Sequence, residues 1–467
     1  VVGAGTAGLV TAAGAAGLGA RVALIERNLM GGDCLNFGCV PSKALIRAAR
    51  AAAEITTASA MGVAADPPAV DFARAMERLR RVRADLSRND SAARFEGLGV
   101  DVFFGEACFV ARDRIAVDGR VLLFRRAVIA TGARPIAPPI AGLAEAGYLT
   151  NETIFSLTEM PRRLAIIGGG PIGCELAQAF ARLGAQVTIL EAMPRILNRE
   201  DFDAAELVRG AIARDGVEIV TGCAIARVEK RGGEKLIEFT REGASRRIVA
   251  DEILIGAGRA PNVEGIGLEA AGVEYDPQCG LRVDDRLRTT NPRIYAAGDV
   301  CTSARFTHTA DAMARIAIRN ALFFGRARAS ALAIPSCTYT DPEIAHIGIY
   351  ESEAEARGVR LRTFTHQFAE VDRAVIDGDA EGFARAHVLA SSGRIAGATI
   401  VGRHASEIIS EVAVAMRAGM TLAALADVIH PYPTHAEALR KLGDAYNRAR
   451  LTPSLKRIFE RWFRLSR

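Results

Sequence analysis

Short apolar runs alternate with Ala-rich helical stretches in the first part of the chain, which is typical of strands and helices that follow one another in an α/β fold. Val1 and Val2 read as the end of a first strand, and a predicted helix continues as far as Gly19. Further apolar runs predict strands at 21–25, 164–167 and 187–190, with a helix at 175–183. The order of strand, turn, helix and strand therefore occurs twice.

The pattern changes from about Ile334 onward. The runs 385–389 and 396–401 read as short strands, and 405–418 reads as an amphipathic helix. This part of the chain therefore predicts a separate lobe in which helices and strands are mixed.

Composition places the chain among globular proteins with more than one core. Its 467 residues suggest three or so lobes, 50% of the residues are hydrophobic, and the net charge is only +5. This balance gives no case for nucleic-acid binding, so we expect small-molecule partners. The eight cysteines are scattered, no apolar run reaches about 18 residues and no signal peptide is evident, so we expect a soluble protein in a reducing cytoplasm.

Each of the two repeated units carries a glycine-rich turn between its strand and its helix. In the first unit, Gly3, Gly5 and Gly8 occupy the turn and Glu26 ends the next strand. The corresponding residues of the second unit are Gly168, Gly170, Gly173 and Glu191. Such glycines let the backbone approach a pyrophosphate at a helix N-terminus, and the acid can bind a ribose diol. The sequence therefore predicts two dinucleotide sites.

Cys34 and Cys39 have a spacing that suits a redox-active disulfide. Five residues of regular helix rise about 7.5 Å, which is beyond the roughly 4.4 to 6.8 Å between the Cα atoms of a disulfide. The pair must therefore lie on an irregular turn, which the neighbouring glycines permit. A helix beginning near Pro41 would favour a thiolate through its dipole. Two free cysteines or half of a metal site are the alternatives for the spacing alone.

A disulfide combined with two dinucleotide sites suggests an electron relay. A nicotinamide gives a hydride to a flavin, and the flavin reduces the disulfide, because a flavin mediates between hydride donors and sulfur. The alternative is a duplicated binding domain without a redox role.

The combined motifs resemble the flavin-dependent pyridine nucleotide-disulfide oxidoreductases, the family of glutathione reductase, dihydrolipoamide dehydrogenase and mercuric reductase. The resemblance covers essentially the whole chain. Besides the glycine turns, the segments that carry it are 34–43, 130–135, 256–262, 294–299 and 339–343 with Gly348. It implies two Rossmann-like domains for FAD and NAD(P) and a C-terminal α+β domain that forms a homodimer with shared active sites.

The resemblance also implies roles for individual residues. Cys39 would lie against the flavin as the charge-transfer thiolate, and the more exposed Cys34 would attack the substrate. Lys43 would pair with Glu175 near the reactive edge of the flavin, where a cation favours the anionic reduced flavin. The remaining residues expected to bind cofactors are Thr131, Gly132, Gly258, Asp299 and Ala310, the last in a helix beginning near Thr309.

Glu191 bears on the choice of nicotinamide. A carboxylate at this position accepts hydrogen bonds from a ribose diol and repels a 2′-phosphate, so NADH is favoured over NADPH. Arg195, four residues further on, could instead reach a phosphate, and Glu191 could simply be solvated.

The main departure from the disulfide-reducing members lies at 430–437. Aligning Pro433, Thr434 and Glu437 places Tyr432 where those members have a His that shuttles protons and is oriented by the Glu. A phenol with an ordinary pKa near 10 is a poor shuttle at neutral pH. Mercuric reductases resemble this chain in having Tyr there. Alternatively, His430 and His435 could take over the acid–base work.

We therefore expect a mercuric reductase-like enzyme that reduces a thiol-reactive substrate such as Hg²⁺, with Cys34, Cys39, Lys43, Glu175, Tyr432 and Glu437 as its catalytic residues and no resident metal. Unlike mercuric reductases, the chain has no cysteine after Cys337 to receive the metal. Dihydrolipoamide or another disulfide is the alternative substrate. A flavin-dependent quinone or oxygen reductase with an idle disulfide, or a nucleotide-binding module without catalysis, is a further alternative.

The expected domains are a first part of the FAD domain at 1–145, an NAD(P) domain at 146–265, a second part of the FAD domain at 266–333, an interface domain at 334–450 and a basic amphipathic tail at 451–467. We expect the tail to pack on its own dimer. Contact with a membrane surface or a protein partner is the alternative, because apolar residues at helical spacing alternate with basic ones. The apolar residues are Leu455, Ile458, Phe459, Trp462 and Phe463, and the basic residues are Lys456, Arg457, Arg461 and Arg464.

Overall fold

The computed structural model describes residues 1–466, so only Arg467 of the predicted tail lies outside the described residues. The chain divides into two compact units. The first comprises 1–196 and 215–332, and the second comprises 197–214 and 333–467. The mixed α/β fold class expected from the sequence is confirmed.

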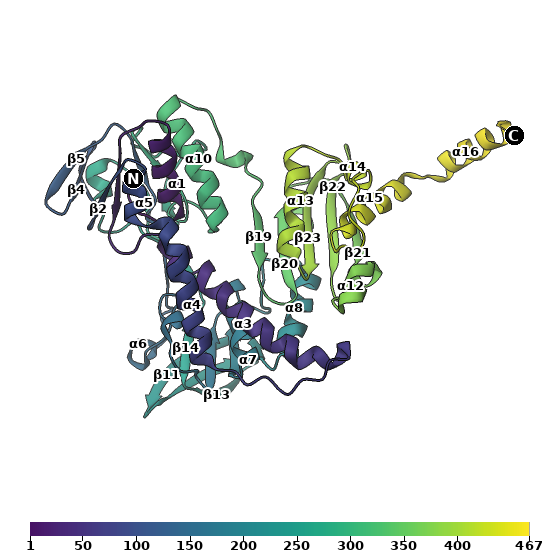
Figure 1. Cartoon of the computed structure of the whole chain (residues 1–467), viewed down its shortest axis with the longest axis horizontal. Coiled ribbons are helices and arrows are strands. Elements are labelled where there is room, and N and C mark those ends of the chain that lie inside the picture. Colours follow the sequence, from purple (N-terminus) through teal and green to yellow (C-terminus); the bar gives the residue numbers. More distant parts are fainter. Residues whose placement is uncertain (467) are drawn as a thin grey trace. The chain divides into compact units, whose positions relative to one another are not determined.

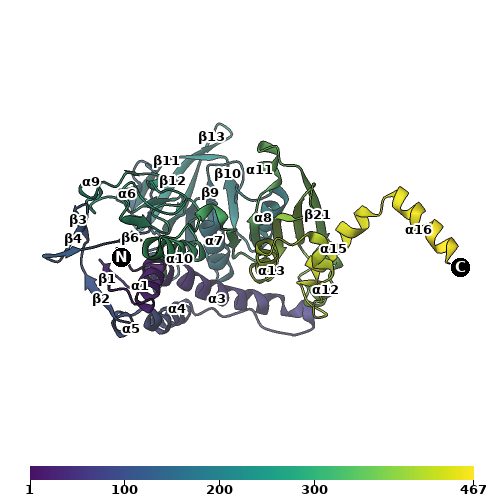
Figure 2. The same ribbon diagram turned by 90° about the horizontal axis from the view of Figure 1, so that it is seen from above.

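The first unit begins with a parallel sheet whose strand order is β2, β1, Val2, β6, β18, with Val2 bridging to Ile25 and Ile129. The first predicted strand is thus reduced to a bridge. Helix α1 packs against α10, and α3 against α4 (Figures 1 and 2). The elements are α1 (Thr6–Gly17), β1 (Val22–Glu26), α2 (Gly32–Asn36), α3 (Cys39–Thr57), α4 (Phe72–Ser87), α5 (Ala92–Gly97), β2 (Val100–Phe104), β3 (Cys108–Ala111), β4 (Arg114–Val117), β5 (Arg120–Leu123), β6 (Ala127–Ile129), β18 (Ile294–Ala296) and α10 (Thr307–Phe323).

A second parallel sheet in the same unit has the order β10, β9, β8, β14. It repeats the first sheet closely, because a three-stranded antiparallel sheet follows the third parallel strand in both: β3 to β5 in the first and β11 to β13 in the second. The elements are β8 (Arg163–Ile167), α7 (Pro171–Arg182), β9 (Gln186–Glu191), β10 (Glu218–Thr221), β11 (Cys223–Arg231), β12 (Glu234–Arg241), β13 (Ala244–Ala250) and β14 (Glu252–Ile255). The duplication predicted from the glycine turns therefore extends to the order of the strands.

Short elements complete the first unit. Strand β7 pairs with β15, and β16 pairs with β17, each antiparallel. Their bounds, with those of two short helices, are β7 (Ala133–Pro135), α6 (Leu143–Ala146), β15 (Arg259–Pro261), α9 (Leu268–Ala271), β16 (Tyr275–Asp276) and β17 (Gly280–Leu281).

The second unit is built on a five-stranded antiparallel sheet with the order β19, β20, β23, β22, β21. Helix α13 packs on β20 and β23, and α15 packs on β21 and β22. The elements are α8 (Phe202–Arg214), β19 (Pro335–Thr338), β20 (Glu343–Gly348), α11 (Glu351–Ala356), β21 (Leu361–Gln367), α12 (Asp372–Asp377), β22 (Phe383–Leu389), β23 (Ile395–Gly402), α13 (Ala405–Arg417), α14 (Leu422–Ala426), α15 (Glu437–Arg450) and α16 (Pro453–Leu465). Among residues 1–466, no helix is both long and apolar enough to span a bilayer.

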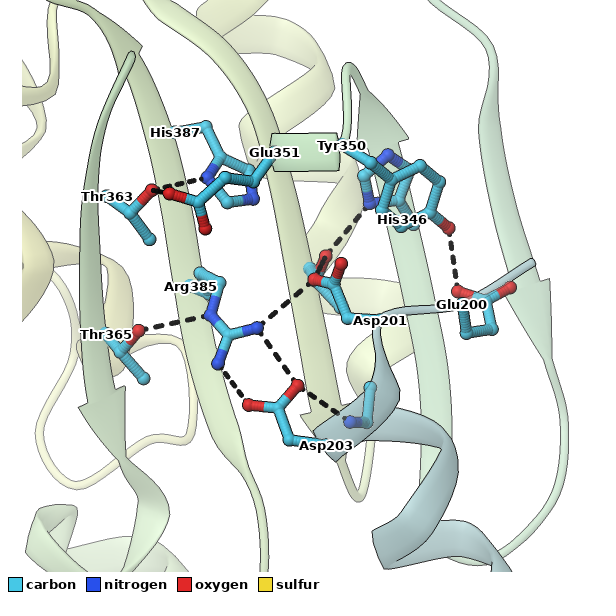
Figure 3. A network of polar contacts seen from close by, with 12 residues as sticks. Glu200, Asp201, Asp203, His346, Tyr350, Glu351, Thr363, Thr365, Arg385 and His387 are labelled. Carbon is cyan, nitrogen blue, oxygen red and sulfur yellow. Dashed lines mark hydrogen bonds and ion pairs between the residues drawn. The ribbon is translucent and has the colours of Figure 1, made fainter. Parts of the chain in front are cut away.

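The two faces of this sheet differ in polarity because side chains alternate along each strand. Ala384, Ala386 and Val388 of β22 are buried in the apolar core. Arg385 and His387, between them, lie on the opposite face in a polar network (Figure 3).

The polar face is joined to the segment that leads into α8. The guanidinium of Arg385 contacts Asp201 at 3.2 Å and also Asp203, and its Nε donates to Thr365. The hydroxyl of Tyr350 donates to Glu200 at 2.7 Å. This network explains why 197–214, which the sequence places between β9 and β10, belongs to the second unit.

Replacing Arg385 with Gln should lower the free energy of unfolding of the second unit by about 2 kcal/mol, because Asp201 and Arg385 are mostly buried and the carboxylate would lose its cation. The measurement is urea denaturation of the FAD-loaded protein followed by circular dichroism. Arg357→Gln is the control, because Arg357 and Glu353 form an exposed pair at 3.9 Å. Equal destabilisation by both substitutions would contradict this reading.

Candidate active site

The two cysteines predicted to react lie on adjoining short elements of the first unit. Cys34 is in α2, and Cys39 is the first residue of α3. The turn between them favours glycine at Gly38, where a Cβ would lie tightly at 3.0 Å from the carbonyl oxygen of Asp33 and 3.2 Å from Cα of Cys34. The irregular turn expected from the spacing is therefore present, and both cysteines are free thiols in this structure.

The two thiols have opposite electrostatic preferences. A hydrogen bond from Cys34 lowers the pKa of Cys39 to about 6, helped by Thr307 and the charge of Lys43. The pKa of Cys34 is raised, first by the hydrogen bond to Cys39 and then by burial. In the reduced pair, Cys39 therefore holds the negative charge and Cys34 holds the proton.

Two helix N-termini lie at Cys39. The thiol begins α3, and its Sγ is 3.4 Å from Oγ1 of Thr307, the first residue of α10. Helix N-termini stabilise thiolates. The sequence analysis missed Thr307, since it placed the helix start two residues later. In the chain alone, Cys39 is exposed and Cys34 is half-buried, so the face of Cys39 is open to a bound group.

Lys43 and Glu175 form the ion pair expected from the sequence, with Nζ 2.7 Å from Oε2. Lys43 is one turn along α3 from Cys39, while Glu175 is on α7 and only 6% exposed. The pair thus joins the cysteine helix to the helix of the second glycine turn. The charge of Lys43 lowers the pKa of Cys39, and the charge of Glu175 raises it.

The two glycine turns have the same construction. A Cβ at Gly8 would lie 1.8 Å from the carbonyl oxygen of Gly3, and a Cβ at Gly173 would lie 2.0 Å from that of Gly168. Both positions therefore demand glycine. Gly5 and Gly170 are the residues directly before α1 and α7.

The acids that end the second strands also match. Glu26 accepts backbone N–H bonds from Ala4 at 2.6 Å and Asn28 at 2.8 Å. Glu191 accepts them from Gly169 at 2.5 Å and Met193 at 2.7 Å. Each carboxylate thus holds its own turn together. Because a carboxylate oxygen has two lone pairs, both acids keep the capacity to accept a ribose hydroxyl.

Thr131 and Gly132 bind another part of the chain. The hydroxyl of Thr131 donates to the carbonyl of Asn262 at 2.7 Å, and the amide of Asn262 donates to the carbonyl of Gly132 at 2.9 Å. The carbonyl of Gly258 accepts from the amide of Ile136. These contacts connect the segments around β7 and β15, a structural role that the motifs did not reveal.

Asp299 follows Gly298, which lies against Ala7 of α1 and Ala310 of α10. Burial raises the pKa of Asp299, although the charges of Arg259 and Arg305 oppose that shift. Several polar atoms nearby are buried without a protein partner: Oγ1 of Thr309 and Nε of Arg259 and Arg305. Buried polar atoms normally have partners, so this region together with the glycine turns fits a polar dinucleotide such as FAD.

Tyr432 and Glu437 lie in the second unit, on the loop between α14 and α15 and at the start of α15. The hydroxyl of Tyr432 is exposed and donates to Oδ2 of Asp372 at 2.8 Å, and Asp372 raises its pKa. Glu437 instead accepts from Arg440 at 2.6 Å, and its other oxygen is buried without a partner. The residue that orients Tyr432 is therefore Asp372, which the sequence analysis missed, and not Glu437.

The two histidines beside Tyr432 differ in their surroundings. His430 contacts Glu411 at 2.9 Å through Nε2 and the carbonyl of Val428 through Nδ1. Burial lowers the pKa of His435. His435 has a ring nitrogen within 4.8 Å of carboxylate oxygens of Asp377 and Asp379, but both carboxylates are paired with arginines, Arg373 and Arg403. The alternative that His430 or His435 carries out the acid–base work stays a prediction.

Comparisons with known proteins agree with this arrangement. A family model described as pyridine nucleotide-disulphide oxidoreductase matches residues 1–314, and the dimerisation domain of the same family matches 334–442. The mercuric reductase of Bacillus cereus is 33% identical over 440 residues, covering 94% of this chain and 70% of the relative. The dihydrolipoyl dehydrogenase of Geobacillus stearothermophilus is 34% identical, covering 94% and 93%. The HOCl-induced flavoprotein disulfide reductase RclA from Escherichia coli has a TM-score of 0.84 at 30% identity, covering 95% of this chain and 98% of that one.

The rate at which iodoacetamide alkylates Cys39 in the reduced protein should increase with pH, with a midpoint at about pH 6, because only the thiolate reacts. Cys34→Ala removes the largest cause of the low pKa, so the midpoint should move toward the ordinary thiol value near 8.5. Mass spectrometry of the Cys39 peptide measures the rate. Cys279→Ser, which removes an exposed thiol elsewhere, should leave the midpoint unchanged. A midpoint above about pH 8 in the unsubstituted protein would disprove the assignment.

Proposed function

The chain belongs to the pyridine nucleotide-disulphide oxidoreductase family, and from this membership we propose that it passes electrons from a reduced nicotinamide through FAD to the Cys34–Cys39 pair and on to a thiol-reactive substrate of the mercuric ion class. The family depends on FAD and a pyridine nucleotide. When bound, FAD accepts a hydride and releases two electrons to sulfur. The observation that carries the substrate assignment is Tyr432 in the place of a proton-shuttling histidine.

The electron balance of this proposal closes without a proton donor at Tyr432. The nicotinamide supplies two electrons as a hydride, and the disulfide takes them to become a thiol and a thiolate. Transfer of those electrons to Hg²⁺ regenerates the disulfide and yields Hg⁰, with one proton released overall. Reduction of a disulfide substrate would instead require protons for the departing thiolates.

Each residue of the first unit has a part in this proposal. Cys39 retains the thiolate because its pKa is low, and Cys34 presents the thiol that exchanges with the substrate. Lys43, fixed by Glu175, supplies positive charge next to Cys39. Because a cation near a reduced flavin favours its anionic form, the same side chain supports both redox centres.

The loop of Tyr432 is proposed to act on the disulfide of the partner subunit. The dimerisation domain supports a homodimer, and an exposed phenol held by Asp372 is suited to contact a bound soft cation or to donate a hydrogen bond. Tyr432 is 70% exposed, whereas His435 is buried and His430 contacts Glu411, which supports Tyr432 as the residue of this loop that meets the substrate.

Dihydrolipoamide is the second candidate substrate, because a dihydrolipoyl dehydrogenase is as similar to this chain as the mercuric reductases are and matches over 93% of its own length. NADH is the proposed nicotinamide. The carboxylate of Glu191 at the second glycine turn would lie near a 2′-phosphate and repel it.

Tyr432→Phe should lower kcat for Hg²⁺ by about tenfold, because the hydroxyl contact is lost. Tyr432→His should raise the rate of lipoamide reduction from a low starting level, because it introduces a proton shuttle. Steady-state oxidation of the nicotinamide with each substrate measures both effects. Tyr350→Phe is the control, because it also removes a tyrosine hydroxyl, but one that donates to Glu200 in the polar network. High lipoamide turnover by the unsubstituted enzyme would favour the second candidate.

Comparison of kcat/KM should show that NADH is preferred to NADPH by at least about tenfold, since the carboxylate repels the additional phosphate. Glu191→Gln removes the charge but keeps hydrogen-bonding capacity, so it should raise kcat/KM for NADPH more than it lowers that for NADH. A strong preference of the unsubstituted enzyme for NADPH would show that Arg195 rather than Glu191 sets the specificity.

A further inference from the structure

The last helix of the chain, α16, is the most exposed regular element of the second unit. It spans Pro453–Leu465, and none of its residues is buried. Thr452 caps it by accepting a hydrogen bond from the amide of Leu455 at 3.3 Å, and Pro453 occupies the first helical position. The sequence therefore specifies where this helix starts. Few other residues of the subunit pack against it.

The exposed side chains of α16 are divided sharply between two faces. At 100° per residue, the apolar side chains occupy an arc of about 160° and the charged ones occupy the remainder. The apolar face consists of Leu455, Ile458, Phe459, Trp462, Phe463 and Leu465. The opposite face consists of Lys456, Arg457, Glu460, Arg461 and Arg464.

The apolar face is too exposed to be an ordinary surface. Trp462 is 66% exposed, Phe463 is 63% exposed and Leu465 is 87% exposed. Exposed apolar residues scattered singly are normal, but a contiguous apolar face with aromatic residues marks a binding surface.

We propose that α16 lies in the interface of an anionic lipid bilayer and attaches the protein peripherally to that surface. Its apolar arc would enter the boundary between headgroups and acyl chains, and its basic residues would contact lipid phosphates. Four cations against one anion on the polar face make it complementary to a negative surface. Trp and Phe are suited to this depth because their rings are large and Trp has one polar atom.

A second copy of α16 fits this face less well. A coiled-coil seam at heptad spacing would use Leu455, Ile458, Trp462 and Leu465. Phe459 and Phe463 would then stay outside the seam, and the cations of the two helices would lie close together. The helix has 13 residues, fewer than two full heptads, so such a seam would be short. A flat surface can accept the whole arc, whereas a seam accepts part of it.

The structure also provides a direct reporter for this proposal, because Trp462 is the single tryptophan of the chain. The FAD-loaded, full-length protein would be mixed with vesicles of phosphatidylcholine containing about a quarter phosphatidylglycerol, and with vesicles of phosphatidylcholine alone. We expect the tryptophan emission to shift to shorter wavelength and the protein to co-sediment with the anionic vesicles. High salt should weaken the binding, since it screens the cations.

Two sets of variants separate the apolar and the charged contributions. Phe463→Glu keeps the reporter but places a charge in the apolar arc, so co-sedimentation should be lost. Arg461→Gln and Arg464→Gln should each weaken the partition coefficient about fivefold, because each cation near an anionic surface adds a similar favourable interaction. Leu123→Glu, which changes an exposed leucine of β5, is the matched control and should bind as the unsubstituted protein does.

Other occupants of the helix give different results. If the tail packs on a second copy, the emission of Trp462 will already be at short wavelength without lipid, and removal of residues 452–467 will dissociate the dimer in light scattering. That pair of results would overturn the proposal. So would equal binding to neutral and anionic vesicles, or absence of co-sedimentation with both, in which case an acidic protein surface would be the better partner.

Discussion

The low pKa of Cys39 depends first on the neighbouring thiol of Cys34, and the two residues come together on a turn that a regular helix cannot provide. Gly38 suits the turn, because a side chain there would crowd Asp33 and Cys34. The start of α3 and Thr307 of α10 then reach the same sulfur. If the turn opened, the thiolate of Cys39 would lose the hydrogen bond that contributes most to its low pKa. The electrostatic environment of Cys39 thus depends on this turn.

The two glycine-turn units share the same internal contacts. In each, a carboxylate at the end of the second strand accepts two backbone N–H groups, one from the glycine turn and one from the residue two positions further on. In each, a glycine of the helix approaches the first glycine of the turn closely. A substitution at any of these positions would change the local backbone of its turn, which is where a nucleotide is proposed to bind.

Much of this arrangement could be predicted from the sequence, because it depends on local rules. The glycine turns, the irregular cysteine turn and the order of strands and helices follow from spacing and hydrophobic periodicity. The Lys43–Glu175 contact was expected only through resemblance to a family, since no local rule joins residues so distant in the chain. Asp372 and Thr307 were missed for the same reason: each meets its partner only through tertiary packing, and neither stands in a recognisable motif. The roles of Thr131 and Gly132 in binding Asn262 were hidden because motif residues can be structural.

The segment that leads into α8 limits how the chain can be divided or recombined. Its sequence lies within the second nucleotide fold, yet Glu200, Asp201 and Asp203 are held by side chains that come much later. A chain shortened to residues 1–332 would keep those acids but lack Arg385 and Tyr350. Exchanging the C-terminal sheet for an unrelated one would therefore leave a mostly buried carboxylate without its cation, unless residues 200–203 were redesigned with it.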